Sequence, residues 1–195
     1  MKKKIFLILL SLICLNLNAQ KKKKTSPKVA KVNVVAKIDN VSVEIFKNNL
    51  NLYILNGKIK DSLNIKSVDT NLPTDFNLKS FIAKGTKLYL LSYVEKSFIQ
   101  SPNKTENITV INSEIYDISS KVKIYSNIQK STKISEKVFL DKLKNASETQ
   151  EKLRNEGYTF ELLSDGDISL TSKSKSSKLT YDVVSKQFLE SKKKK

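Results

Sequence analysis

Residues 86–95, TKLYLLSYVE, decide the fold, because they carry apolar side chains on both faces of a predicted strand. Side chains alternate between the two faces of a strand. One face presents Leu88, Leu90 and Val94, and the other presents Tyr89, Leu91 and Tyr93. A strand that is apolar on both faces is covered on both sides. We therefore expect residues 86–95 to form a central strand with other structure packed against each face.

Period-two alternation on both sides of this segment predicts a chain of short antiparallel strands. The predicted strands cover residues 32–38, 41–45, 50–55, 58–65, 108–110, 115–118, 122–128 and 179–183. Turns are expected at Asp39-Asn40, Asn56-Gly57 and Ser119-Ser120, and polar loops at residues 97–106 and 172–178. Asn56-Gly57 is the strongest hairpin signal, because both residues tolerate positive φ. Residues 76–82 are compatible with a strand or with one helical turn.

One short helix is predicted late in the chain. Ser147 and Gln150 have the spacing of a capping box, in which each side chain satisfies an unpaired N–H of the first helical turn. Glu148 stands four residues before Lys152, the favourable order for a helical ion pair. Gly157 supplies the left-handed residue that closes a helix.

A hairpin is expected directly after this helix. Its alternating residues are Tyr158, Phe160 and Leu162, then a turn at 164–167, then Ile168 and Leu170. A helix this short needs a sheet to lie on. The predicted fold class is therefore mainly β, of the α+β type: an antiparallel meander sheet or sandwich with one short helix near Ser147–Glu156.

The first twenty residues have the layout of a secretory signal peptide. Basic residues 2–4 precede an apolar run, residues 5–15, that is too short to span a bilayer. Cleavage is expected between Ala19 and Gln20. Anchoring as a lipoprotein through Cys14 is disfavoured, because that processing needs a small residue where Ile13 stands. The predicted divisions are a signal peptide (1–19), a flexible basic leader (20–28), a single β-rich domain (29–190) and a lysine tail (191–195).

Two segments resemble proteins of one bacterial group. The ending Asn16-Leu-Asn-Ala-Gln20, after a lysine start and a Leu/Ile core, resembles the export signals of Bacteroidota, particularly those of the flavobacterial type. Residues 142–157, with the hairpin that follows them, are similar to uncharacterised secreted proteins of that group. The resemblance implies export, and it carries no activity or functional residue with it.

The formal charge of +17 is concentrated in short lysine runs. Removing the 11 lysines at residues 2–4, 21–24 and 192–195 leaves 25 basic and 19 acidic residues, a formal charge of +6. Arg154 is the one arginine in the sequence. Readers of phosphates and bases usually need planar guanidinium groups. A nucleic-acid partner is therefore disfavoured.

Missing residue types exclude several chemistries. The sequence contains no His and no Trp, and its one cysteine, Cys14, lies in the predicted signal peptide. The mature chain would therefore form no disulfide, no zinc site of Cys or His and no catalytic triad with a His base. The four glycines are too far apart for a nucleotide-binding loop. No cofactor and no metal are predicted.

Two patterns that could bind a ligand have simpler explanations. Asp165 and Asp167 flank Gly166, but a calcium loop needs further oxygen ligands in order, so an ordinary turn is favoured. Tyr89 and Tyr93 share one face of a strand and could replace the usual Trp platform for a sugar. Packing in the core is the favoured role for both tyrosines.

Two further patterns could carry covalent chemistry. Ser120 with Lys123, and Ser172 with Lys175, have the S-x-x-K spacing of Ser/Lys acyl enzymes. That dyad depends on helical spacing, which neither predicted strand nor turn provides, so coincidence is favoured. Ser62, in Asp61-Ser62-Leu63, resembles the short O-glycosylation motif of Bacteroidota and is the candidate modification site.

The leading functional prediction is an exported, non-catalytic protein that binds or scaffolds in the periplasm or outside the cell, with an unknown partner. One alternative is a carboxylate-based hydrolase of glycans, which needs two acidic side chains meeting in a concave pocket. Another is a basic adhesin for anionic envelope surfaces. The contacts expected for that adhesin are Lys21, Lys22, Lys23, Lys24, Lys192, Lys193, Lys194 and Lys195.

Overall fold

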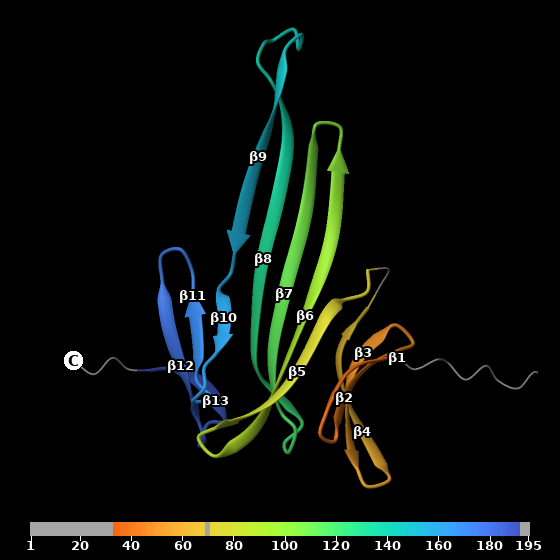
Figure 1. Cartoon of the computed structure of the whole chain (residues 1–195), viewed down its shortest axis with the longest axis vertical. Coiled ribbons are helices and arrows are strands. Elements are labelled where there is room, and N and C mark those ends of the chain that lie inside the picture. The colour runs from red at the N-terminus through yellow and green to blue at the C-terminus, as the bar shows by residue number, and fades with distance from the viewer. Residues whose placement is uncertain (1–32, 69–70, 192–195) are drawn as a thin grey trace, which may run out of the picture. The chain divides into compact units, whose positions relative to one another are not determined.

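The computed structural model describes residues 33–68 and 71–191, and each regular element within them is a β-strand. The strands form three antiparallel sheets (Figure 1). The prediction of a mainly β, antiparallel fold is therefore confirmed. The predicted signal peptide with its Ala19–Gln20 cleavage site, the basic leader, and the lysine runs at 21–24 and 192–195 lie outside the described residues.

The first four strands form one sheet, which we call the N-terminal sheet, and they are joined by two-residue turns. They are β1 (Asn33–Ile38), β2 (Val41–Phe46), β3 (Asn49–Asn56) and β4 (Ile59–Ser67). The hairpin predicted at Asn56-Gly57 is confirmed, but its turn lies one residue later. Asn56 pairs with Ile59, so Gly57 and Lys58 form the turn. Gly57 has a φ of 63°, a conformation that glycine adopts without steric cost.

The middle five strands form the long sheet, in the order β5-β6-β7-β8-β9. They are β5 (Thr74–Ala83), β6 (Thr86–Ser101), β7 (Lys104–Asp117), β8 (Val122–Phe139) and β9 (Ser147–Glu156). The polar loop predicted at residues 97–106 is wrong, because only Pro102 and Asn103 separate β6 from β7. Residues 76–82, for which the sequence allows two structures, lie in β5.

The last four strands form the C-terminal sheet. They are β10 (Thr159–Leu162), β11 (Ile168–Thr171), β12 (Ser176–Asp182) and β13 (Gln187–Glu190). The hairpin predicted after residue 157 is confirmed, since Phe160 pairs with Leu170 and Leu162 with Ile168. The turn predicted at residues 172–178 is shorter than expected, because β12 begins at Ser176.

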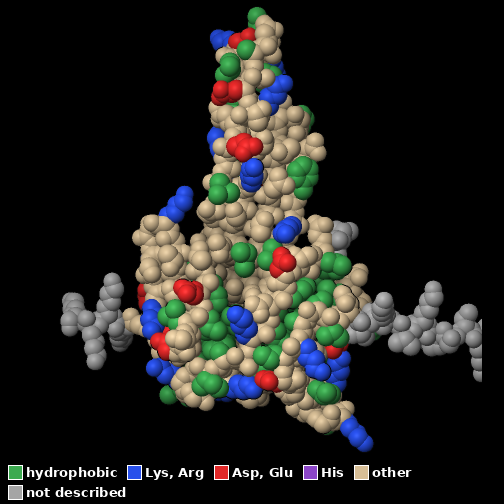
Figure 2. Space-filling view, in the orientation of Figure 1, with side chains coloured by type: hydrophobic (Ala, Val, Ile, Leu, Met, Phe, Trp, Pro, Cys, Tyr) green, Lys and Arg blue, Asp and Glu red, His purple; other side chains and the backbone are tan. Residues whose placement is uncertain are grey.

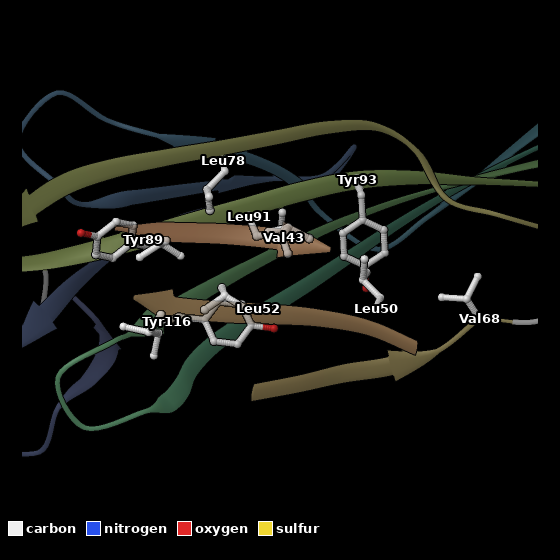
Figure 3. Packing of buried hydrophobic residues seen from close by; sticks show 11 residues of the cluster. Val43, Leu50, Leu52, Val68, Leu78, Tyr89, Leu91, Tyr93 and Tyr116 are labelled. Atoms are coloured by element: carbon white, nitrogen blue, oxygen red, sulfur yellow. The ribbon is translucent and has the colours of Figure 1, made fainter. Parts of the chain in front are cut away.

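One face of β6 packs against the N-terminal sheet. Leu91 and Tyr93 share a cluster of buried side chains with Leu50 and Leu52 of β3 (Figure 3). Leu91, Leu50 and Leu52 are fully buried. The ring of Tyr93 also stacks on Phe76 of β5, with centroids 5.8 Å apart. The face of β6 that carries Leu91 and Tyr93 is therefore buried in a core, as the alternation in residues 86–95 predicts.

The other face of β6 packs against the C-terminal sheet. Leu88 and Leu90 belong to a second cluster with Ile168 of β11, Tyr181 of β12 and Phe188 of β13. The rings of Tyr181 and Phe188 lie 5.4 Å apart between centroids, a contact that favours the pairing of the last two strands. The prediction that residues 86–95 are covered on both faces is confirmed, and β6 joins the two cores.

The helix predicted near Ser147–Glu156 is wrong, because these residues form β9. Every one of them pairs with a residue of β8, from Phe139↔Ser147 to Lys130↔Glu156. The capping-box spacing and the Glu148–Lys152 spacing are local signals, and an isolated helix of ten residues is marginal in water. A complete ladder of backbone hydrogen bonds with a long neighbouring strand outweighs them.

Gly157 ends β9 and lets the chain approach β8 closely. The prediction that it adopts a left-handed conformation is confirmed by its φ of 81°, although it ends a strand rather than a helix. A Cβ at this position would lie 2.2 Å from the carbonyl oxygen of Ile128. Only glycine therefore fits where the chain leaves the long sheet for the C-terminal sheet.

Candidate functional site

The long sheet continues well past the two cores (Figure 1). Its β5 pairs with β6 only as far as Val94, and the core clusters reach no further along β6 than Tyr93. Beyond that point the strands β6, β7, β8 and β9 pair only with one another. We call this part the distal ribbon; it comprises residues 95–101, 104–110, 130–139 and 147–156.

The edge of β6 in the distal ribbon carries backbone groups without a strand partner among the described residues. Ala83 and Thr86 close the β5–β6 turn as a pair, so the N–H and C=O groups of even-numbered β6 residues point towards β5. Because β5 begins at Thr74, opposite Val94, it does not reach further. Lys96, Phe98 and Gln100 therefore present these groups outwards.

The other strand of the hairpin confirms this geometry. Ser101 and Lys104 close the two-residue turn between β6 and β7, so this pair exchanges both backbone hydrogen bonds. The N–H and C=O groups of Ser97, Ile99 and Ser101 consequently point towards β7. Within residues 96–101, the N–H groups of odd-numbered residues are therefore hydrogen-bonded to β7, and those of even-numbered residues have no strand partner among the described residues.

Large apolar side chains flank this edge. Phe98 is 57% exposed on one face of the ribbon, and Ile99 is 51% exposed on the opposite face. Figure 2 shows apolar side chains spread among charged ones along the ribbon. A strand edge with exposed apolar side chains is a template for pairing with another chain.

The two edges of the ribbon differ in how well charge protects them. Five of the ten residues of β9 are charged, whereas two of the seven β6 residues in the distal ribbon, Glu95 and Lys96, are charged. Charged side chains on an edge strand disfavour pairing with another chain. The edge of β6 is therefore the better docking edge, and β9 is the protected one.

One face of the distal ribbon is closed by charged side chains. Thr132 is fully buried and Ile134 is 8% exposed, although neither belongs to a core cluster. Their cross-strand neighbours include Arg154 and Lys152. Long basic side chains can cover apolar surface with their stems while their charges stay in water. The ion pairs across this face are Lys104–Glu106, Lys130–Glu156 and Arg154–Glu156.

The same charges act on Glu106. A hydrogen bond from Lys104 lowers the pKa of Glu106, and the charges of Arg154 and Lys130 lower it further. Because this carboxylate stays ionised, it balances the basic side chains around it. The face that carries Thr132 thus holds paired charges around Glu106, and the exposed side chain of Ile99, the cross-strand partner of Glu106, lies beside them at the edge of β6.

Thr132 also yields a test of this packing. Among the described residues its hydroxyl is the one buried side-chain polar atom without a hydrogen-bond partner, and leaving such a group unpaired costs roughly 1–3 kcal/mol. Valine has the same shape without the hydroxyl, so we expect Thr132→Val to raise the free energy of unfolding by about 1 kcal/mol. Urea denaturation measures this change, with Thr149→Val on exposed β9 as the control. A loss of stability in Thr132→Val alone would mean that the hydroxyl is hydrogen-bonded.

Two carboxylates line one hollow on the N-terminal sheet, which is the place to test the hydrolase alternative. Asp39 and Glu44 both line a cavity of about 320 Å³, together with Tyr53 and Lys60. Lys60 donates to Glu44 at 2.7 Å, and its ammonium lies 3.9 Å from the ring centre of Tyr53. A hydrogen bond from Lys87 lowers the pKa of Asp39. Each carboxylate is paired with a lysine, which favours a structural role over that of a general acid.

The tyrosines considered as a sugar platform lie in the core. Tyr89 is 5% exposed and Tyr93 is 2% exposed, so the favoured prediction of core packing is confirmed. The hydroxyl of Tyr89 donates to Asp39 at 3.3 Å. Burial raises the pKa of Tyr93 above its usual range.

The remaining sequence patterns lie in turns or at an edge. Asp165 accepts a hydrogen bond from the N–H of Asp167, and Lys178 lies within 3.0 Å of both carboxylates, as in a turn held by a lysine. Ser172 bonds to the backbone of Lys175 within its own turn. Ser62 is exposed on the edge strand β4, where a modifying enzyme could reach it.

In the other S-x-x-K pair, Ser120 and Lys123, both side chains also form hydrogen bonds within the fold. The hydroxyl of Ser120 donates to Asp117, and Lys123 donates to Glu114 at 3.0 Å. The two side chains therefore serve different carboxylates. The interpretation of this spacing as coincidence agrees with these contacts.

The residues of the ribbon edge are absent from the sequence predictions. The predicted loop at residues 97–106 and the predicted helix near Ser147–Glu156 leave no place for a ribbon in this part of the chain. The signal that the sequence offers is the pair Phe98-Ile99, inside a segment that is otherwise polar. Two adjacent large apolar residues point to opposite faces of a strand, and this pair indicates one.

Within residues 33–68 and 71–191 no helix has the length and apolar character that crossing a membrane requires. Within the same ranges no group of three or more His, Cys, Asp or Glu side chains could hold a metal ion. No protein-family model, curated protein or solved structure matches the chain.

Proposed function

We propose that the protein is an exported binding protein whose distal ribbon takes up an extended polypeptide strand along the edge of β6. The observation that carries this proposal is the row of outward backbone groups at Lys96, Phe98 and Gln100, bordered by the exposed side chains of Phe98 and Ile99. The expectation of export rests on the pattern of residues 1–20.

The geometry supports separate contributions, with affinity from backbone hydrogen bonds and specificity from side chains. An added strand would accept and donate hydrogen bonds at every second residue of β6, which gives affinity with little dependence on sequence. Phe98 and Ile99 would contact the added strand from opposite faces, because neighbouring side chains alternate. Apolar residues at matching positions of the partner would then give specificity.

The arrangement favours binding over hydrolysis of glycans. The two carboxylates that share a hollow, Asp39 and Glu44, are each paired with a lysine. A glycosidase needs one carboxyl group that keeps its proton and delivers it to the leaving group. The outward edge of β6, by contrast, needs no further group to act as a docking site.

A backbone test separates strand addition from other modes of binding. Proline at residue 100 removes an outward N–H but no hydrogen bond to β7, so the β6–β7 hairpin should persist. Peptides selected on the wild-type protein from a displayed random library should lose about tenfold in affinity for Gln100→Pro. They should bind Gln100→Ala within about twofold, because alanine keeps the N–H.

The side-chain contribution is tested with Phe98→Ala, which we expect to weaken the same peptides. Circular dichroism of each variant checks that the strands are retained. Peptides that bind Gln100→Pro and Gln100→Ala equally well would show that the edge of β6 is not the docking site. A selection that yields only peptides insensitive to both Gln100→Pro and Phe98→Ala would refute the proposal in the same way.

A further inference from the structure

The loop between β8 and β9, residues 140–146, combines exposed leucines with lysines at the end of the distal ribbon. Leu140 is 63% exposed and Leu143 is 81% exposed. Soluble proteins expose single apolar side chains routinely, but here two large ones are exposed within four residues of one short loop. From this patch and the charges around it, we infer that the loop is a contact site for an anionic phospholipid surface.

The position of the loop makes it accessible. The last pair between β7 and β8 is Lys104↔Glu136, whereas β8 and β9 continue to pair up to Phe139↔Ser147. The β8–β9 hairpin therefore extends past the end of the β6–β7 hairpin (Figure 1). Leu140 and Leu143 lie at its end, away from both core clusters.

The charges beside the leucines favour an anionic surface over a neutral one. Lys137 and Lys144 lie over the ring of Phe139, at 5.3 Å and 5.4 Å from its centre. Lys142 stands between the two leucines. Lysine side chains can place their stems against apolar groups and their ammonium groups at the level of lipid phosphates.

The one acidic residue of the loop serves its internal structure. Asp141 accepts a hydrogen bond from the backbone N–H of Asn145 at 2.8 Å, and the N–H of Leu140 donates to the C=O of Ala146 at 3.0 Å. These bonds close the loop and hold its leucines outward. Within residues 140–146 the two lysines, Lys142 and Lys144, exceed the single carboxylate of Asp141 by one charge, so the loop is weakly basic as well as apolar.

A second exposed apolar turn lacks this chemistry and serves as a matched control. Val183 and Val184, between β12 and β13, are 51% and 92% exposed. The neighbouring Lys186 lies 3.5 Å from Asp117, and Asp182 accepts hydrogen bonds from Ser185. This turn is apolar but has no excess of unpaired basic groups, and we expect it to contribute little to binding of anionic lipid.

Vesicle binding tests the inference with the whole mature chain. The probes are vesicles of phosphatidylcholine mixed with phosphatidylglycerol, and vesicles of phosphatidylcholine alone. Flotation with the mixed vesicles should show binding that weakens at least about tenfold in the double variant Leu140→Ala/Leu143→Ala. Lys142→Ala/Lys144→Ala should weaken it about fivefold per lysine at low salt, and Val183→Ala/Val184→Ala should change it less than twofold.

Two results would overturn the inference. One is failure of the wild-type chain to bind the mixed vesicles better than phosphatidylcholine alone. The other is equal binding by Leu140→Ala/Leu143→Ala and the wild type, which would assign the interaction to the lysine runs at 21–24 and 192–195. The inference does not rest on the edge of β6, so Gln100→Pro should bind vesicles like the wild type whatever happens to peptide binding.

Discussion

Leu91→Ala is expected to lower the free energy of unfolding by about 2–5 kcal/mol. Leu91 is fully buried and packs in the cluster that joins β6 to the N-terminal sheet. Truncation removes buried methyl groups and leaves a cavity among fixed neighbours, and both effects add to the cost. Urea denaturation followed by circular dichroism measures the loss, with Leu143→Ala in the exposed β8–β9 loop as the control.

The opposite face of β6 should be equally sensitive. Leu88 is fully buried against the C-terminal sheet, so Leu88→Ala should cost a similar amount. Because β6 is common to both cores, either substitution should destabilise the strands on both sides of it. The double variant should unfold near room temperature, since domains retain only about 5–15 kcal/mol in total. Normal stability in either single variant would contradict the placement of β6 between two cores.

Asp117→Asn is expected to cost about 2 kcal/mol of unfolding free energy at neutral pH. The carboxylate of Asp117 is 2% exposed and accepts hydrogen bonds from the backbone and hydroxyl groups of Ser119 and Ser120. Burial raises the pKa of Asp117, but these hydrogen bonds outweigh burial and lower the pKa to about 2. Asparagine keeps the shape of the side chain but loses the charge that these donors favour.

The pH dependence follows from the direction of this shift. The pKa of Asp117 is lower in the folded chain than the ordinary value of 3.8, so the unfolded chain binds the proton more readily. The stability from Asp117 is fully present above about pH 4 and is lost as the pH falls through about 2. Between pH 6 and pH 2, the free energy of unfolding should therefore fall more steeply for the wild type than for Asp117→Asn.

An exposed carboxylate provides the control for Asp117. Glu161 is exposed on β10, so Glu161→Gln should leave the free energy of unfolding nearly unchanged. If the wild type and Asp117→Asn lost stability in parallel between pH 4 and pH 2, the turn at residues 119–121 would not hold an ionised Asp117.

Much of the fold could be predicted from local pattern. Residues 86–95 have apolar side chains on both faces, and the structure places a core on each of them. The alternation of Phe160 and Leu162, resumed by Ile168 and Leu170, predicted the hairpin that β10 and β11 form. In these segments the hydrophobic period and the turn residues agree, and tertiary contacts follow the same pattern.

The distal ribbon could not be predicted as a whole, because most of its residues are polar. A strand in which both faces meet water has no hydrophobic period to reveal it. Residues 147–156 contain Glu, Lys, Leu and Arg, which favour helices locally, and only pairing with β8 makes them a strand. Residues 97–101 follow the same rule, because their pairing with β7 is visible only in the structure.

The candidate site could not be predicted from the sequence either. A row of unpaired backbone groups has no side-chain signature, so no motif could identify Lys96, Phe98 and Gln100 as a docking edge. The same holds for the leucines of the β8–β9 loop, which resemble core residues until the structure shows them exposed. Sequence chemistry predicts catalytic and metal sites far better than sites made by an edge.

Residue-resolved amide exchange by NMR tests the central claim most directly. In the free protein the N–H groups of Lys96, Phe98 and Gln100 should exchange rapidly, whereas those of Ser97, Ile99 and Ser101 should be protected by β7. A bound strand peptide should slow the first three and leave the others unchanged. Uniform protection of all six amides in the free, monomeric protein would mean that the edge of β6 is already occupied, and the account would fail.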